Sequence, residues 1–350
     1  MIKEKTLLVD NFPFFKQKGQ SIEKSVQSLN LIFVEPSGQT ECQYINNQFI
    51  YKPLLWLKSI DLQNVKEINM IYVESKPTDL LKQKIYESFP NIKINFFHLF
   101  HFANYFFFEL GQKLSLKNFT KTRTNNCFYS VATIRLPRYY LLQYMQTHNI
   151  DYFGCPFIEE NMLKNFNEQI KNLSNSTEVI KNFKNEEKRP YGYIGQPEFE
   201  VKQMPLLADS YISIVTHYPW YDYVSHFYDE KISLPIAAKS LPFFFDNKDA
   251  NKNLVDIGFE PYKGFDYSAD SIDNFITRWK TNLDNNKKFL INNNDAKSIY
   301  DLNKDIIDKN YKILNETNWK AKALTEINSL PEKIKQSIFE NTDFMEKSLL

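Results

Sequence analysis

The chain has 350 residues, of which 43% are apolar and 24% are charged, and its formal net charge is +1 at pH 7. This length suits two domains of about 150 residues each, and the composition is that of a globular protein that folds in water. A net charge near zero excludes an overall electrostatic attraction to nucleic acid or to an anionic membrane.

The cysteines, Cys42, Cys127 and Cys155, lie far apart in the sequence. Their odd number and wide spacing fit neither a disulfide framework nor a zinc site, which favours a reducing compartment. The amino-terminal apolar run is too short for a secretory signal, and no stretch approaches the roughly 18 apolar residues of a membrane helix. We therefore expect a soluble protein of the cytoplasm that spans no membrane.

The first half of the chain alternates short apolar runs with amphipathic segments. Runs rich in β-branched and aromatic residues predict strands at 6–9, 29–34, 69–73, 92–97, 127–132 and 151–154. Helical spacing predicts helices at 54–58, 78–88, 103–114 and 138–147. Strands that alternate with helices indicate a parallel sheet covered on both faces, so we expect a Rossmann-like first domain over residues 1–157.

The second half is organised around residues 211–265. Its pattern predicts a strand at 211–216, a loop, a helix that opens on Glu230 and Lys231, a second strand at 241–245 and a helix over 249–256. We expect a second Rossmann-like domain over 158–290, followed by a helical segment over 291–350. The predicted fold is therefore α/β, with two Rossmann-like domains facing each other across a cleft.

Glu230 and Lys231 are the central candidates for ligand binding. In open α/β sheets, ligands bind in the crevice outside the carboxyl ends of the strands, and a helix N-terminus there favours a phosphate. Lys231 adds a positive charge for a diphosphate, and Glu230 can accept hydrogen bonds from a ribose diol, so a nucleotide sugar suits the pair. The alternative is that Glu230 only occupies the first helical turn, where the helix dipole favours acidic residues.

The loop at 217–228 is unusually aromatic. Its rings, that of Tyr218 included, suit stacking on a nucleobase or a sugar, and Asp222 suits hydrogen bonds to sugar hydroxyls; a packed lid over the sheet explains the same residues. His217 directly follows a predicted strand and is a candidate acid or base. Glu35 ends another predicted strand before a glycine-containing turn and is a candidate catalytic base, with an ordinary polar turn residue as the alternative.

His98 and His101 stand three residues apart in a Phe-rich run. No third metal ligand accompanies them, and no DxD pair flanked by apolar strands is present in the sequence. We therefore expect residues that line a core or a cleft, no required divalent metal, and no cofactor apart from a nucleotide-sugar substrate.

Two stretches carry a family pattern. The first consists of YISIVT at 211–216, FYDEKISLPIAA at 227–238, LPFFF at 241–245 and NLVDIGF at 253–259. The second runs from SVATIRLPRYYLLQYMQ at 130–146 to IDYFGC at 150–155. Together they resemble the donor-binding region of GT-B glycosyltransferases of the fucosyltransferase-like and exostosin-like branches, and they are similar to a set of uncharacterised phage-encoded proteins.

The resemblance implies a metal-independent glycosyltransferase that moves a sugar from a nucleoside-diphosphate sugar to a hydroxyl of a glycan or another acceptor. By position in the motifs, Arg138 would reach the donor diphosphate, while Glu230 and Lys231 would hold the ribose and the phosphate. Lys239 stands near the turn where the family pattern has a small residue, usually Gly. For a phage- or virus-encoded chain, the expected location is the cytoplasm of the host.

Two other functions stay open at this point. A phage-type enzyme that glycosylates DNA bases needs a basic groove, and the basic residues form only modest clusters at 113–123 and 181–189. Nucleic acid is therefore the less favoured acceptor. A non-catalytic carbohydrate-binding or virion-associated protein would keep the fold without the chemistry.

Overall fold

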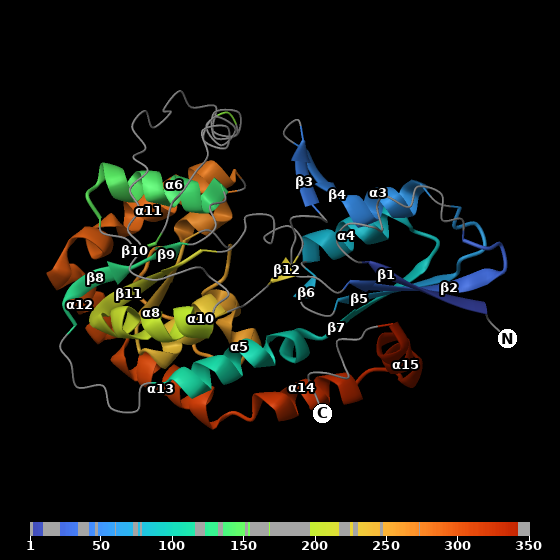
Figure 1. Ribbon diagram of the computed structural model, residues 1–350. Helices are drawn as coiled ribbons and strands as arrows, with labels where there is room; N and C mark the ends of the chain where they lie inside the picture. Colours follow the sequence, from blue (N-terminus) through green and yellow to red (C-terminus); the bar gives the residue numbers. More distant parts are fainter. Residues whose placement is uncertain are drawn as a thin grey trace. The chain divides into compact units, whose positions relative to one another are not determined.

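The computed structural model describes residues 3–9, 22–33, 42–45, 48–59, 61–72, 76–77, 79–115, 123–131, 136–150, 153–154, 168, 197–216, 225–226, 230–245, 248–272 and 274–341. The chain forms two compact units, which are drawn in Figure 1. Unit 1 comprises Met1–Phe106, Trp220–Tyr228 and Asn318–Leu350, and unit 2 comprises Phe107–Pro219 and Asp229–Thr317.

The division between the units differs from the predicted border at residue 157, because unit 2 already begins at Phe107. Strand β8 (Asn125–Phe128) explains the difference, since it pairs with β11 (Ser210–Val215) in the sheet of unit 2. Sequence alternation shows that a strand exists but not which sheet it joins. The C-terminal helices are also divided, because the chain returns to unit 1 at Asn318.

Unit 1 is built on a four-stranded parallel sheet with the order β1-β2-β5-β7 (Figure 1). The strands are β1 (Lys3–Val9), β2 (Val26–Phe33), β5 (Glu67–Tyr72) and β7 (Lys93–His98). The central strands β2 and β5 are almost wholly buried, and they contain the buried polar residues Asn30 and Asn69 among their apolar ones. The predicted alternation of parallel strands and helices is confirmed.

The other elements of unit 1 follow the chain around this sheet. They are the hairpin β3 (Cys42–Ile45) and β4 (Gln48–Tyr51), the pair β6 (Lys76–Pro77) and β12 (Ser225–His226), and the helices α3 (Lys52–Ser59), α4 (Asp79–Ser88), α14 (Trp319–Asn328) and α15 (Glu332–Asn341). Helix α5 (Phe100–Leu114) begins in unit 1 and ends in unit 2. The hairpin was not predicted from the sequence.

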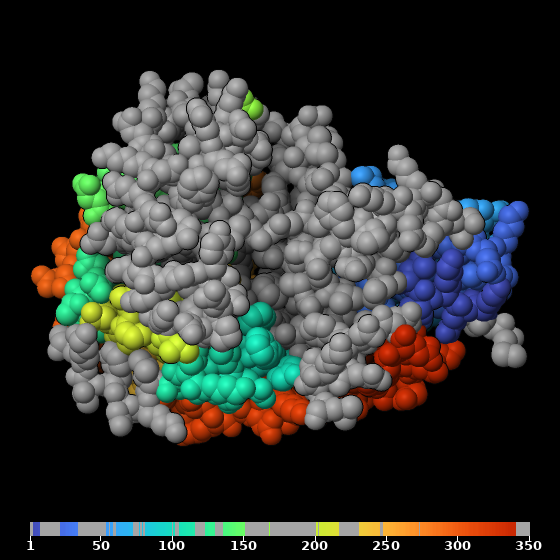
Figure 2. Space-filling view, in the orientation of Figure 1, coloured from blue at the N-terminus to red at the C-terminus, as the bar shows by residue number. Residues whose placement is uncertain are grey.

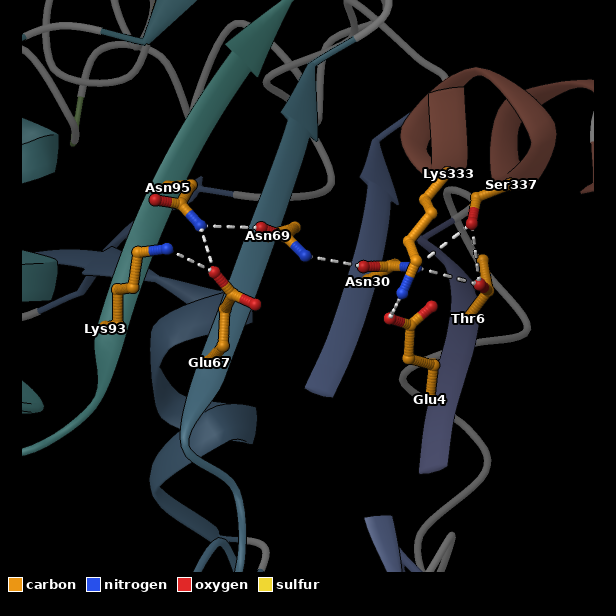
Figure 3. A network of polar contacts seen from close by, with 9 residues as sticks. All are labelled: Glu4, Thr6, Asn30, Glu67, Asn69, Lys93, Asn95, Lys333 and Ser337. Atoms are coloured by element: carbon orange, nitrogen blue, oxygen red, sulfur yellow. Dashed lines mark hydrogen bonds and ion pairs between the residues drawn. The ribbon is translucent and has the colours of Figure 1, made fainter. Parts of the chain in front are cut away.

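A row of polar side chains crosses the sheet of unit 1 (Figure 3). Thr6, Asn30, Asn69 and Asn95 lie directly opposite one another on the four strands. Asn95 donates to Asn69 and Asn69 donates to Asn30, both at 2.8 Å. Asn30 then donates to Ser337 on α15 at 3.0 Å. Because a one-residue slip of any strand would break this row, it fixes the register of the sheet and docks α15 onto it.

We expect Asn30→Ala to lower the free energy of unfolding by about 2–4 kcal/mol, because it removes the buried acceptor of Asn69 and the donor to Ser337. Urea-induced unfolding measures the change. Asn95→Ala is the matched control, since Asn95 is half-buried on an edge strand where water can replace its bonds, and it should cost less than about 1 kcal/mol. An equal loss of unfolding free energy in the two variants would show that the buried bonds of Asn30 do not stabilise the sheet more than the half-buried ones of Asn95.

Unit 2 contains a second parallel sheet, in which β13 (Leu241–Phe244), β11 and β8 lie in that order. A single residue, Tyr129, separates β8 from β9 (Ser130–Val131), and β9 pairs in parallel with β10 (Phe153–Gly154). The predicted strand–helix–strand unit is confirmed, because β11, α10 (Glu230–Ala237) and β13 follow one another and the two strands are neighbours.

Helices cover both faces of this sheet (Figure 1). α6 (Leu136–Thr147) packs on α11 (Phe275–Ile291), where Tyr144 donates a hydrogen bond to Asp284 at 3.2 Å. α8 (Pro197–Asp209) and α10 pack together on the opposite face, with α13 (Lys304–Glu316) against α10. α12 (Asn293–Leu302) contacts β8 and β11. Among the helices that the structure describes, none has the length and the apolar run needed to cross a membrane.

The helix predicted over 249–256 is wrong. These residues form a turn and a short 3-10 helix at Lys252–Asp256. Asp249 has a left-handed backbone with a φ of 56°, and the amide of Asn251 bonds both the N–H and the C=O of Tyr262, at 2.9 and 2.8 Å. These bonds to a distant segment outweigh the local helical spacing.

A buried arginine joins two helices of unit 2 at the amino-terminal edge of the sheet. Arg123 lies just before β8 and is 6% exposed. Its guanidinium donates to carbonyl oxygens at the ends of α8 and α10, namely those of Leu207 (3.2 Å), Ala208 (2.6 Å), Ser210 (2.7 Å), Ala238 (3.1 Å) and Lys239 (2.6 Å). The last carbonyl groups of a helix lack helical partners and carry partial negative charge, so one cation satisfies both helix ends.

Arg123→Lys should lower the free energy of unfolding by about 3 kcal/mol, because a single ammonium cannot reach the carbonyl groups of both helices. Differential scanning calorimetry measures the loss. Thr124→Ala is the control: Thr124 is exposed and bonds Asp209 at the end of α8, and its removal should cost less than about 1 kcal/mol. A lysine variant as stable as the natural protein would show that the two helix ends do not depend on the guanidinium.

Candidate functional site

The strand order of unit 2 contains a point at which the chain reverses its direction across the sheet. From β9 the chain passes through α6 to β10 on one side, and then through α8 to β11 on the other side of β8. Right-handed connections place α6 and α8 on opposite faces of the sheet, as Figure 1 shows. Ligands of such sheets bind outside the carboxyl ends of the strands at this point, which in unit 2 are β9 and β11.

Three predicted binding residues begin helices at this edge. A helix that connects parallel strands runs antiparallel to them, so it starts at their carboxyl ends. Arg138 lies in the first turn of α6 and is half-buried. Glu230 is the first residue of α10, and Lys231 follows it with a half-buried side chain. The structure therefore places the starts of both helices after the carboxyl ends of parallel strands in unit 2, to which Arg138 belongs, whereas the sequence predicted Arg138 in the first domain.

Several groups at this edge can bind an anion. The N-termini of α6 and α10 each present backbone N–H groups that no helical carbonyl accepts, with a partial positive charge. The guanidinium of Arg138 and the ammonium of Lys231 add two full charges. Two helix ends and two cations suit an anion with several oxygens, such as a diphosphate.

Helix α10 is held in place by close packing. The residues at 232–238 are all buried. A Cβ atom added at Gly111 on α5 would stand 3.0 Å from the Cβ of Ser233 and 3.3 Å from Leu314 on α13. Figure 2 shows parts of α5 and α8 at the molecular surface. Helix α10 contacts both of these helices, and its contact with α5 is made by two small residues, Ser233 and Gly111. The start of α10 is therefore fixed at the edge of the sheet.

The residue that departs from the family pattern ends this helix. Lys239 follows α10 with a φ of 53°, the left-handed region that glycine adopts most easily. Its ammonium pairs with Asp308 at 2.6 Å and lies 4.6 Å from the ring centroid of Tyr311, both on α13. These contacts offset the backbone strain, so the helix ends as it would with Gly.

We expect Lys239→Ala to lower the free energy of unfolding by about 1–2 kcal/mol, because it keeps the left-handed strain and loses both contacts. Lys239→Gly is the matched variant: it loses the same contacts but removes the strain, which is worth about 1 kcal/mol. Thermal unfolding of the two proteins should therefore rank Gly above Ala. The reverse order would mean that backbone strain at Lys239 is insignificant.

The two histidines of unit 1 do not form a metal site within the described residues. His98 ends β7 and is exposed, and His101 lies in the first turn of α5 and is half-buried. Burial lowers the pKa of His101 to about 4, with further contributions from Lys322 and His98, so His101 is neutral at pH 7. In the part of the chain that the structure describes, no group of three His, Cys, Asp or Glu side chains is placed to hold a metal ion.

The remaining predicted site residues, Glu35, His217, Tyr218 and Asp222, lie outside the described residues. The strands that lead to them are described: β2 ends at Phe33 and β11 at Val215, followed by buried Thr216. Glu35 and His217 thus follow the carboxyl ends of parallel strands in sequence, and their roles stay predictions.

No protein-family model matches the sequence, and no characterised protein matches it in sequence. Among solved structures, the chain is similar to the pneumococcal O-GlcNAc transferase GtfA in complex with UDP and GlcNAc, with 11% identity and a TM-score of 0.37 over 87% of this chain and 53% of that chain. It is similar to the DNA-modifying enzyme β-glucosyltransferase, with 11% identity and a TM-score of 0.38 over 87% of this chain and 83% of that chain. The chain spans about half the length of GtfA.

Proposed function

We propose that this protein is a glycosyltransferase of the GT-B type, which binds a nucleoside-diphosphate sugar and transfers the sugar to a hydroxyl of a glycan or another acceptor. The observation that carries the proposal is the placement of Arg138, Glu230 and Lys231 at the carboxyl edge of the sheet of unit 2, where the strand order reverses. The same three residues are those that the sequence motifs relate to donor binding.

In the proposed reaction, the acceptor oxygen attacks the anomeric carbon of the donor and the bond from that carbon to the phosphate oxygen breaks. Negative charge then builds up on the departing diphosphate. The start of α10, Lys231 and Arg138 stabilise that charge, a contribution that is often the largest in such catalysis. Glu230 would accept hydrogen bonds from the ribose. This scheme uses protein cations and helix ends, with no divalent metal.

The acceptor proton goes to a base. We propose Glu35 or His217 for this role, since each follows a parallel strand directly or within a few residues. Tyr218 would stack on the nucleobase or the sugar of the donor, and Asp222 would bind sugar hydroxyls. A cytoplasmic location belongs to the same proposal, supported by the odd number and wide spacing of the cysteines in the sequence.

We expect Lys231→Ala to weaken nucleotide-sugar binding by about tenfold to a hundredfold, because a charge-assisted bond to a phosphate is lost. Thermal shift against UDP-, GDP-, ADP- and CMP-sugars measures this, since a ligand stabilises the folded protein by RT ln(1 + [L]/Kd). The variant should melt near the temperature of the natural protein without ligand and show a much smaller shift with it.

Lys297→Ala is the matched control, because Lys297 is an exposed lysine of α12 in the same unit, paired with Asp301. It should leave the ligand-induced shift unchanged. An unchanged shift for Lys231→Ala would remove Lys231 from the site, and the absence of any shift across the panel with the natural protein would refute donor binding.

A further inference from the structure

A carboxylate outside the motif residues lies at the carboxyl end of β13, the strand next to β11. Asp270 belongs to the short 3-10 helix Ser268–Ser271, and its Oδ2 accepts a hydrogen bond from the backbone N–H of Asp249 at 2.8 Å. Tyr267, which precedes this 3-10 helix, accepts a hydrogen bond from the N–H of Phe244 at the end of β13. Asp270 is therefore placed at the same edge of the sheet as the starts of α6 and α10.

The segment that leads to Asp270 is held rigidly. Asparagine amides bond both the N–H and the C=O of residues along it, as a neighbouring strand would. These pairs are Asn310 with Glu260 (2.7 and 2.8 Å), Asn251 with Tyr262 (2.9 and 2.8 Å), Asn303 with Lys263 (2.8 and 2.9 Å) and Asn286 with Asp266 (both 2.8 Å). Asp270 is thus preorganised by its support, as a ligand-binding group needs to be.

The charge on Asp270 costs stability. The pKa of its carboxyl is raised to about 6, mainly by burial and to a smaller extent by the charge of Asp249, against the lowering effects of the Asp249 N–H, Arg278 on α11 and Lys248. The pKa in the folded protein therefore exceeds the ordinary value of 3.8. Its contribution to stability is complete below pH 3.8 and is lost as the pH rises through 6. At neutral pH the protein carries a charge that the fold disfavours.

The hydrogen bond to Asp249 does not require this charge. An asparagine oxygen would accept the same N–H without the cost of burying an anion. Within the described part of the chain, Oδ1 of Asp270 has no hydrogen-bond donor. An ionised acceptor with an oxygen to spare is suited to a ligand that donates hydrogen bonds, and charge-assisted bonds of this kind are about twice as strong as neutral ones.

We propose that Asp270 binds the sugar of the donor, by accepting a hydrogen bond from a sugar hydroxyl. This inference rests on the proposed function. The charge of each side chain determines which part of the ligand it can bind. Lys231 and Arg138 attract the diphosphate, whereas Asp270 repels it and suits the neutral, hydroxyl-rich sugar. Asp270 would therefore distinguish a nucleotide that carries a sugar from one that does not.

Asp270→Asn tests this directly. The variant should melt at a higher temperature than the natural protein at pH 7.5, because it removes a buried charge and keeps the bond to Asp249. Its affinity for the nucleotide sugar that shifts the natural protein most should fall about tenfold or more. Its affinity for the same nucleotide without the sugar should not fall, because the removed charge only repels the diphosphate. A rise in stability together with a loss of sugar-dependent affinity is not expected of a residue with only a structural role.

The pH dependence of the natural protein gives a second measurement that needs no variant. The ratio of the affinities for the nucleotide sugar and for the methyl ester of the same nucleoside diphosphate cancels effects of pH on the phosphates, because neither ligand has a free terminal phosphate, which would titrate near pH 6. This ratio should fall as the pH is lowered through about 6, where Asp270 takes up a proton. In Asp270→Asn the ratio should be low and constant between pH 5 and 8.

Asp305→Asn, a change of an exposed acidic residue in the first turn of α13, is the control and should leave the ratio and its pH dependence as in the natural protein. If the natural protein binds nucleotide sugars but the ratio is the same in Asp270→Asn and does not change with pH, the role of Asp270 is refuted and the proposed function stands. If the natural protein binds no nucleotide sugar, both fail.

Discussion

The guanidinium of Arg123 is the interaction on which the architecture of unit 2 depends. Its hydrogen bonds to carbonyl oxygens of Leu207, Ala208, Ser210, Ala238 and Lys239 connect the ends of two helices that share one face of the sheet. It lies over the ring of Tyr300 on α12 at 4.7 Å, so a third helix is tied to the same point. Burial lowers the pKa of the group, and the carbonyl oxygens around it supply the partners that a buried cation needs.

Asparagine side chains likewise hold extended segments in place through hydrogen bonds. In unit 1 three of them lie in a row on neighbouring strands, and in unit 2 four of them pair with the backbone of the segment at 260–266. A primary amide carries a donor and an acceptor, so it can satisfy a backbone N–H and C=O together. This chain therefore uses side chains where other proteins use strand pairing, and it keeps irregular segments fixed near the carboxyl edge of the sheet.

Sequence reasoning found what depends on local pattern. The four strands of the parallel sheet of unit 1 and the unit of β11, α10 and β13 were predicted because apolar runs with clear breaks mark them, and the helix start at Glu230 followed from the same pattern. It missed α8, which contains Pro205 and does not read as one helix. The membership of β8 in unit 2, and with it the position of Arg138, depends on strand pairing between residues far apart in sequence. No local signal marks Arg123 either, because its partners are carbonyl groups of distant helix ends.

The two ends of α10 explain why its start is suited to an anion. At its C-terminus, the partial negative charge is neutralised by Arg123, and Lys239 adds a second cation that is paired with Asp308. At its N-terminus the first two residues are Glu230 and Lys231, whose opposite charges offset each other, so the backbone N–H groups there can still bind an anion. A helix that is stabilised at one end and buried along 232–238 presents its first N–H groups at the edge where the strand order reverses. Preorganised dipoles of this kind need no rearrangement when negative charge develops on a leaving phosphate, which is the condition for efficient electrostatic catalysis.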